Sequence, residues 1–492
     1  MGLYKNIIAN FLGVIFTTVL TFLVVPYYLE WLGPESYGLV GFATLLQNWL
    51  MIISAGFNPV AGRFAARAQS GHERWSDAYT LFRSIDGFIF AIGFCIVIFL
   101  FLLPVSSYDT WFNASNIDKT VLSRSAILLV IVSILRLASA VNRGIIANLE
   151  MQIWLNLHLS IFSFLRFAAS LPIVYIYRDV ISLFNWWAFV SILEYGTLQL
   201  KIKNIIPVSG KFFSFSLILL KKHGKFALTL SFTSLVWVAI TQLDKVIFTK
   251  LMTLESFGVF STSVLLSSGV LLLSQPLTQA LQPRLIKAYA SGGIASLESE
   301  LRSATKLIII TLLPVCAVLS LRSEDVMYLW TANSDIAHKA AVYLPGYVIG
   351  NYFAALLGLL YLLQVAVGDV KLHFKGNVFF SLLLIPIMVY LALNFEPVFV
   401  SYFWAIANFI MLVCWGEFVV RKFAHSLRFV WVLVDVVIPT STLILISFLL
   451  LSLINFSISE CSRVNVFINL VCSYLLLLIL TVLLIFKLKL KK

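Results

Sequence analysis

The sequence predicts an all-α, polytopic integral membrane protein with about 14 transmembrane helices, as two parallel-repeat six-helix bundles plus two C-terminal helices. Three observations predict this class: the composition, the spacing of apolar runs and an internal repeat. Of 492 residues, 61% are hydrophobic and 12% are charged, and the mean hydropathy is +0.98. Soluble domains carry about 25% charged residues, so this chain lacks the polar residues to cover a water-facing surface.

Apolar runs long enough to cross a bilayer recur from one end of the chain to the other. Continuous runs of about 18 or more apolar residues are typical of membrane helices. The strands of a membrane barrel would instead alternate over about 10 residues. The predicted helices lie near residues 7–25, 38–60, 85–103, 121–142, 157–177, 181–199, 226–249, 258–280, 307–323, 341–363, 377–394, 398–420, 431–454 and 464–486.

One nine-residue motif occurs twice and organises the chain. Residues 32–40 read LGPESYGLV, and residues 252–260 read MTLESFGVF, so that Glu35 and Gly38 correspond to Glu255 and Gly258. Further along, Arg63, Ser70 and Gly71 correspond to Arg284, Ser291 and Gly292. Six helices per copy is an even number, so both copies enter the membrane from the same side. We therefore predict bundles at residues 1–200 and 226–424, a basic cytoplasmic linker at 201–225, and two added helices at 425–492.

The formal net charge of +13 follows membrane topology and does not indicate nucleic-acid binding. Most of the 35 Lys and Arg residues fall in segments that are cytoplasmic if both termini are inside, as the positive-inside rule expects. Arg143 belongs to one of these cytoplasmic segments in this interpretation. The first apolar run is too long for a cleaved signal core and lacks a small-residue cleavage site, so we expect it to remain as a helix.

Polar residues recur on the helices that begin each half. In the first helix, Asn10, Thr17 and Thr21 share one face at helical spacing. The substrate route of parallel-repeat transporters lies between the halves, so we expect these faces to line it, with rocking of the halves giving alternating access. Packing contacts between helices are the alternative interpretation. The uncharged candidates are Asn10, Thr17, Gln47, Asn48, Ser234, Thr241, Ser274 and Gln275.

Charged residues inside helices are the sharpest indication of a site, since an Arg or Lys at a helix centre costs about 2.5–3.5 kcal/mol. Arg166 either lines a cavity and attracts an anion or forms a structural pair, and Arg136 either lines the cavity or snorkels. Asp244 and Lys245 are adjacent and either neutralise each other or face the route. Four acidic residues are placed at helix ends, with interfacial roles favoured over proton coupling: Asp86, Glu194, Glu417 and Asp435.

The sequence carries no signature of catalysis. There is no GxxxxGK[ST] phosphate-binding loop, and the six histidines lack metal-ligand spacing. The predicted external loops are short, whereas a membrane glycosyltransferase or polymerase would need a larger one for its active site. We therefore expect a protein that is not an enzyme, with no catalytic residue, no metal and no cofactor.

With these residues in view, the chain resembles the Wzx-type O-antigen and polysaccharide flippases of the multidrug/oligosaccharidyl-lipid/polysaccharide exporter superfamily. The resemblance rests on Asn10, Gly13, Pro26, residues 32–40, the basic loop after Pro59, Asp244–Lys245, residues 255–260 and Gly368–Asp369. It implies a flippase in the bacterial inner membrane that carries an undecaprenyl-diphosphate-linked glycan to the periplasmic leaflet, coupled to an ion gradient. Its implied partners are that glycan, membrane lipids, a polysaccharide polymerase and a chain-length regulator, and no nucleic acid.

Two other functions stay open. A cation-coupled multidrug exporter of the same superfamily would favour acidic residues deep in the N-terminal half, and the predicted helices have none near their centres. A polysaccharide polymerase or ligase is disfavoured by the short external loops.

Overall fold

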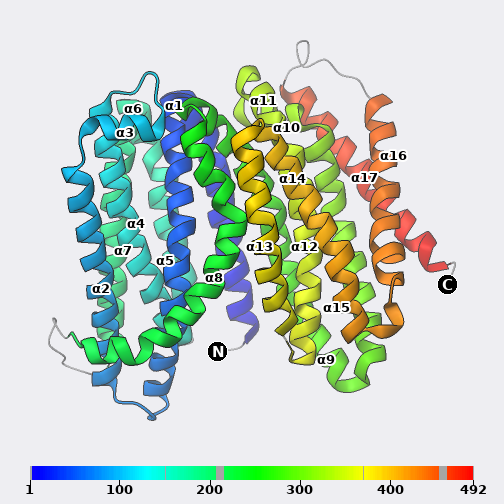
Figure 1. Cartoon of the computed structure of the whole chain (residues 1–492), viewed down its shortest axis with the longest axis horizontal. Coiled ribbons are helices and arrows are strands. Elements are labelled where there is room, and N and C mark those ends of the chain that lie inside the picture. The colour runs from blue at the N-terminus through cyan, green and yellow to red at the C-terminus, as the bar shows by residue number, and fades with distance from the viewer. Residues whose placement is uncertain (1–2, 150, 207–214, 370, 454–462, 491–492) are drawn as a thin grey trace. The chain divides into compact units, whose positions relative to one another are not determined.

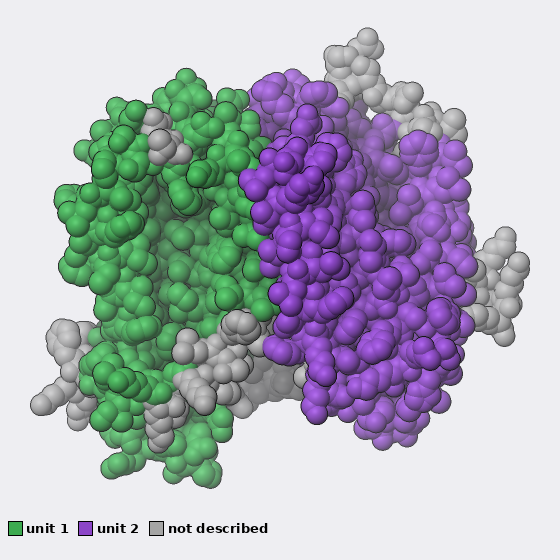
Figure 2. Space-filling view, viewed as in Figure 1, with its two compact units in different colours: residues 1–258 green, residues 259–492 purple. Residues whose placement is uncertain are grey.

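The computed structural model describes residues 3–149, 151–206, 215–369, 371–453 and 463–490, and within them the regular elements are helices (Figure 1). Ten described elements are long and apolar enough to cross a membrane. This confirms the predicted fold class, and the chain is a multi-pass membrane protein. Its contacts divide it into two compact units, residues 1–258 and 259–492 (Figure 2).

Unit 1 contains eight helices and the first residues of a ninth. Its apolar core lies where α1 (Leu3–Gln69), α2 (Trp75–Leu102), α4 (Lys119–Asn148) and α7 (Val180–Ile205) pack together. The elements are α1 (Leu3–Gln69), α2 (Trp75–Leu102), α3 (Val105–Phe112), α4 (Lys119–Asn148), α5 (Gln152–Arg166), a 3-10 turn (Ala168–Ser170), α6 (Leu171–Tyr177), α7 (Val180–Ile205) and α8 (Leu217–Leu251).

Unit 2 is built around the helix α12 (Leu344–Val367). The buried residues of this helix contribute much of the unit's apolar core. Trp431 is fully buried there, and its indole Nε1 donates to Thr305 Oγ1 at 2.8 Å. The elements are α9 (Leu254–Leu321), α10 (Ser323–Thr331), α11 (Ser334–Ala341), α12 (Leu344–Val367), α13 (Lys371–Asn394), α14 (Pro397–Ile410), α15 (Gly416–Phe423), a 3-10 turn (His425–Leu427), α16 (Ile438–Leu453) and α17 (Arg463–Leu490), with π-helical segments at Met411–Trp415 and Trp431–Val437.

The first two predicted helices are joined in α1. The break lies at Gly33, whose φ of 80° is in the region that favours glycine, and Pro34 then begins the second segment, as proline commonly does at a first helical turn. The first predicted helix, residues 7–25, stops just before Pro26, but in the structure the helix continues through this proline. A proline inside a membrane helix is tolerated because neighbouring helices and local adjustments satisfy the freed backbone groups.

The long helix α9 is also interrupted at a glycine, but at a different position of the repeat. It spans 68 residues and is interrupted at Gly293, which has a φ of 62°. In the first half, the basic segment after α1 turns at Gly71, with a φ of 78°. Alignment of the repeat paired Gly71 with Gly292, so the left-handed residue lies one position later than expected. Both copies nevertheless use a glycine at this turn.

The two copies of the motif pack against each other within unit 1. A Cβ added to Gly38 would collide with the carbonyl oxygen of Leu254, and one added to Gly258 would collide with that of Pro34. Because Pro34 and Leu254 are themselves equivalent under the repeat, the contact is reciprocal. Glu35 ties the first copy to the segment after α3 by accepting the backbone N–H groups of Ser115 and Asn116, at 2.6 and 3.0 Å.

Helix α8 starts at Leu217, inside the predicted linker, and runs beside α1 (Figure 1). Because α8 packs with the first half, the boundary between the compact units lies after the predicted linker. It falls between Gly258 and Val259, near the end of the second copy of the motif. Domain boundaries drawn from the repeat, at residues 200, 225 and 424, stay predictions about the duplicated modules.

Candidate functional site

A cavity of about 470 Å³ lies within unit 1 between α1, α4 and α5, with both polar and apolar residues in its lining. Two of its lining residues, Arg136 and Arg143, are basic, and among the lining residues that the structure describes none is acidic. Several others carry uncharged hydrogen-bonding groups. The lining residues are Gln47, Asn48, Leu50, Ser54, Asn58, Ser133, Arg136, Leu137, Ala140, Arg143, Gly144, Ala147, Leu155 and Leu159.

Helix α4 places both arginines on the cavity wall. They are seven residues apart, which is about two helical turns, so they share one face. The helix begins at Asp118, whose side chain accepts the Thr120 N–H at 2.9 Å, and it ends at Asn148. We expected Arg143 in a cytoplasmic loop, and that placement is wrong. The helix continues past it because Ile145 and Ile146 are buried in the unit's core.

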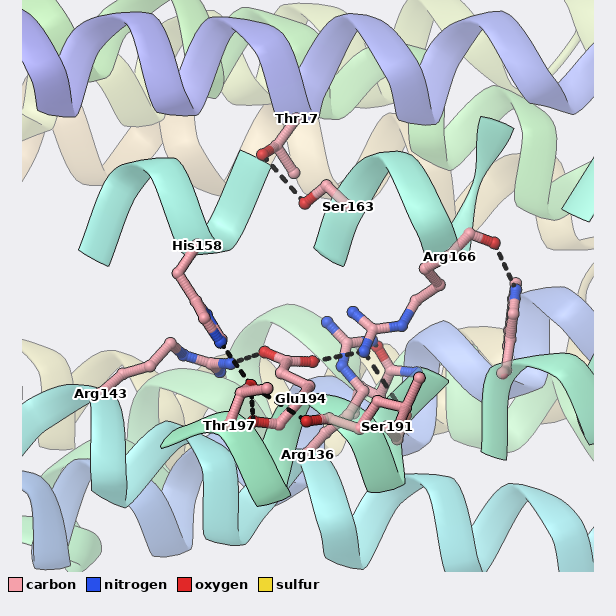
Figure 3. A network of polar contacts seen from close by, with 12 residues as sticks. Thr17, Arg136, Arg143, His158, Ser163, Arg166, Ser191, Glu194 and Thr197 are labelled. Carbon is pink, nitrogen blue, oxygen red and sulfur yellow. Dashed lines mark hydrogen bonds and ion pairs between the residues drawn. The ribbon is translucent and has the colours of Figure 1, made fainter. Parts of the chain in front are cut away.

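Glu194 on α7 joins two arginines in one buried cluster (Figure 3). Its Oε1 lies 2.5 Å from Arg143 Nη1, and its Oε2 lies 2.5 Å from Arg166 Nη2. The side chains of Glu194 and Arg166 are 2% and 6% exposed, whereas that of Arg143 is 21% exposed. The placement of Glu194 at a helix end is also wrong, because α7 extends to Ile205.

Polar contacts hold this cluster in place from three helices. Arg136 Nη1 donates to Gln47 Oε1, which links α4 to α1. Arg166 Nη2 also donates to Ser191 Oγ at 3.4 Å, and its carbonyl oxygen accepts the Trp187 indole N–H at 3.1 Å. That carbonyl is available because α5 ends at Arg166 and a 3-10 turn follows.

A second buried carboxylate, Asp86 on α2, lies apart from the lining residues. It accepts from Tyr195 Oη at 3.0 Å and from Gln199 Nε2 at 2.5 Å, and Arg83 Nη1 lies 3.6 Å away. Because α2 starts at Trp75, Asp86 sits about three turns inside the helix, and its predicted place at a helix end is wrong.

Some of the predicted site residues line the cavity and others do not. Gln47, Asn48 and Arg136 line the cavity, and Asn48 Nδ2 donates to Gln242 Oε1 of α8 at 3.3 Å. Arg166 is not a lining residue, since its guanidinium is turned to Glu194. Thr17 Oγ1 lies 3.2 Å from Ser163 Oγ, between α1 and α5 (Figure 3).

The remaining candidates lie elsewhere. Lys245 Nζ contacts Asp244 Oδ1 at 2.9 Å and donates to the Thr241 carbonyl at 2.7 Å. In unit 2, Ser274 donates to the Leu271 carbonyl of its own helix, and Gln275 is exposed. The side chains of Asn10 and Ser234 fall outside those that the structure describes. A role in binding stays a prediction for every residue in the candidate set.

The candidate set from the sequence left out four residues of the cavity and its cluster: Arg143, Glu194, Asn58 and Ser133. The seven-residue spacing from Arg136 could have indicated Arg143, which directly follows the predicted helix at residues 121–142. Ser133 is 2% exposed, and its Oγ is buried at the cavity wall. Within the described residues, no group of three or more His, Cys, Asp or Glu side chains could hold a metal ion.

Comparisons with known proteins indicate a family, through a family model, and a fold, through solved structures. A family model described as "Polysaccharide biosynthesis protein" matches residues 3–289. The structure titled "Lipid II flippase MurJ, inward closed conformation" is 15% identical, with a TM-score of 0.74 and coverage of 98% of this chain and 99% of that one. An inward-facing multidrug resistance MATE family transporter of the MOP superfamily is also 15% identical, with a TM-score of 0.68 and coverage of 83% and 96%. The search of curated proteins gave no match.

Proposed function

From the premise that the chain belongs to the polysaccharide biosynthesis protein family, we propose that it is a flippase for an undecaprenyl-diphosphate-linked oligosaccharide. It would carry an O-antigen or similar repeat unit from the cytoplasmic to the periplasmic leaflet of a bacterial inner membrane by alternating access. Both termini would lie in the cytoplasm. The observation that carries the proposal is the cavity of unit 1, whose described lining combines two arginines, several neutral polar groups and no acidic residue.

The chemistry of this lining suits a lipid-linked diphosphate sugar. A guanidinium presents a planar fork of donors that matches phosphate oxygens, and such charge-assisted bonds are stronger than neutral ones. The amides of Gln47, Asn48 and Asn58 can both donate to and accept from sugar hydroxyls. A volume of about 470 Å³ lies in the range of small-molecule pockets, which suits the diphosphate and adjoining sugar while the prenyl chain stays in lipid.

A cation-coupled multidrug exporter is the second candidate, and one structural feature favours it. Asp86 and Glu194 lie deep inside helices of the N-terminal half, where the sequence had indicated no acidic residue. However, Glu194 contacts two arginines, and Arg83 lies near Asp86. The cavity wall therefore favours an anionic ligand. These two carboxylates are also where we propose that an ion gradient could act on transport.

The decisive experiment replaces both cavity arginines, as Arg136→Gln/Arg143→Gln. We expect transport to fall about 100-fold or more, since each charge-assisted hydrogen bond contributes about 1.5–3 kcal/mol. Glu194 would keep Arg166 as its partner, so the variant should still insert. The measurement is surface polysaccharide in cells lacking the wild-type gene, together with the leaflet in which lipid-linked repeat units accumulate.

Arg124→Gln is the matched control, because Arg124 is an exposed arginine of the same helix. We expect it to restore long-chain polysaccharide fully. Wild-type export by the double variant would overturn the assignment of this cavity. Single repeat units accumulating in the periplasmic leaflet would indicate a polymerase, and efflux of cationic dyes by the wild-type chain would indicate a multidrug exporter.

A further inference from the structure

We propose that Glu194 is an internal counter-anion that competes with the substrate diphosphate for Arg143 and so weakens substrate binding. This inference rests on the proposed function and specifies how that site controls affinity. Glu194 does not line the cavity, so it would act through Arg143, which does.

The geometry of the cluster is asymmetric in a way that permits exchange. Each oxygen of Glu194 contacts a different arginine, both at 2.5 Å. Arg166 is buried and is not among the cavity-lining residues, whereas Arg143 lines the cavity and is partly exposed. If Arg143 turns to a phosphate oxygen, Glu194 keeps Arg166 as its partner, and no buried carboxylate is left uncompensated.

The formal charges of the cluster show how the exchange would affect the binding of an anion. Arg136, Arg143, Arg166 and Glu194 carry a formal net charge of +2, so the cluster attracts an anion while retaining one negative group of its own. A phosphate oxygen must displace that carboxylate to bond fully to Arg143. A flippase has to release its substrate in the second leaflet, and a competing carboxylate keeps the bound state from becoming too stable for release.

A purely positioning role for Glu194 makes the opposite prediction. If the carboxylate only holds the Arg143 guanidinium in a productive orientation, its removal frees the side chain and weakens diphosphate binding. If Glu194 competes, removal strengthens binding. Disruption of the fold would also weaken binding, so a gain in affinity cannot arise from structural damage.

The test uses the double variant Glu194→Gln/Arg166→Gln in the purified full-length chain. Removing Glu194 together with Arg166, its more buried partner, avoids leaving Arg166 without a carboxylate, and the formal net charge of the cluster stays at +2. The control is Arg67→Gln/Glu73→Gln, which neutralises an exposed pair at 3.2 Å whose side chains are 45% and 30% exposed. Binding of radiolabelled undecaprenyl diphosphate in detergent micelles is measured for each protein.

We expect the Glu194→Gln/Arg166→Gln variant to bind undecaprenyl diphosphate about tenfold more tightly than the wild type, the scale of one charge-assisted hydrogen bond. The control should bind as the wild type does. Unchanged or weaker binding by the test variant, with wild-type binding intact, would overturn the counter-anion and leave the proposed function standing. If the wild type binds no better than Arg136→Gln/Arg143→Gln, the diphosphate site itself is refuted, and this inference with it.

Discussion

Glu194→Ala is expected to destabilise the protein by about 3–5 kcal/mol, because it removes the one carboxylate that Arg143 and Arg166 share. Arg143 can turn toward the cavity and regain solvation. Arg166 has no such route, since its side chain is 6% exposed and does not line the cavity. The measurement is thermal unfolding in detergent, followed by tryptophan fluorescence, together with the yield of monodisperse protein.

The comparison is Glu73→Ala, which breaks the exposed pair with Arg67. Exposed pairs contribute about 0–1 kcal/mol, so we expect this variant to unfold near the wild-type temperature. Adding Arg166→Gln to the glutamate substitution should recover much of the loss, since it removes the uncompensated cation. A Glu194→Ala protein as stable as Glu73→Ala would show that the buried cluster does not require this carboxylate.

Gly258→Val is expected to cost about 1–3 kcal/mol or more, because the added side chain would enter a contact made by backbone atoms. Its Cβ would meet the Pro34 carbonyl oxygen and would lie 2.9 Å from the Gly38 nitrogen. Neither atom can move without shifting the kink of α1. We therefore expect loss of stability and of polysaccharide export, measured by the same unfolding and complementation assays.

Two further variants make this expectation specific. Gly38→Val should have a similar effect, and the double variant should cost less than the sum of the two, since both substitutions disrupt one contact. Gly358→Ala is the control on α12, where an added Cβ meets no heavy atom within 4 Å. That change should be neutral or slightly stabilising. Additive losses at Gly38 and Gly258 would contradict the reciprocal contact.

The sequence alone determined the class of the protein, because composition and apolar run length depend only on which residues occur in order. It also revealed the duplicated motif and the unusual arginines within the helices. The misplacements of Asp86, Arg143 and Glu194 have one physical source: hydropathy ends a helix where charged residues begin. Helices α2, α4 and α7 extend beyond those points, and the charged residues there are buried against one another.

The tertiary structure decided which cations line the cavity of unit 1. The sequence left open whether Arg166 lines a cavity or forms a structural pair, and the structure pairs it with Glu194, outside the cavity lining. Arg143 appeared to belong to a loop, yet it lines the wall. These three residues come from α4, α5 and α7, and Glu194 is 51 and 28 residues from its two partners. A local pattern cannot show such pairing, because it depends on how helices rotate and pack against one another.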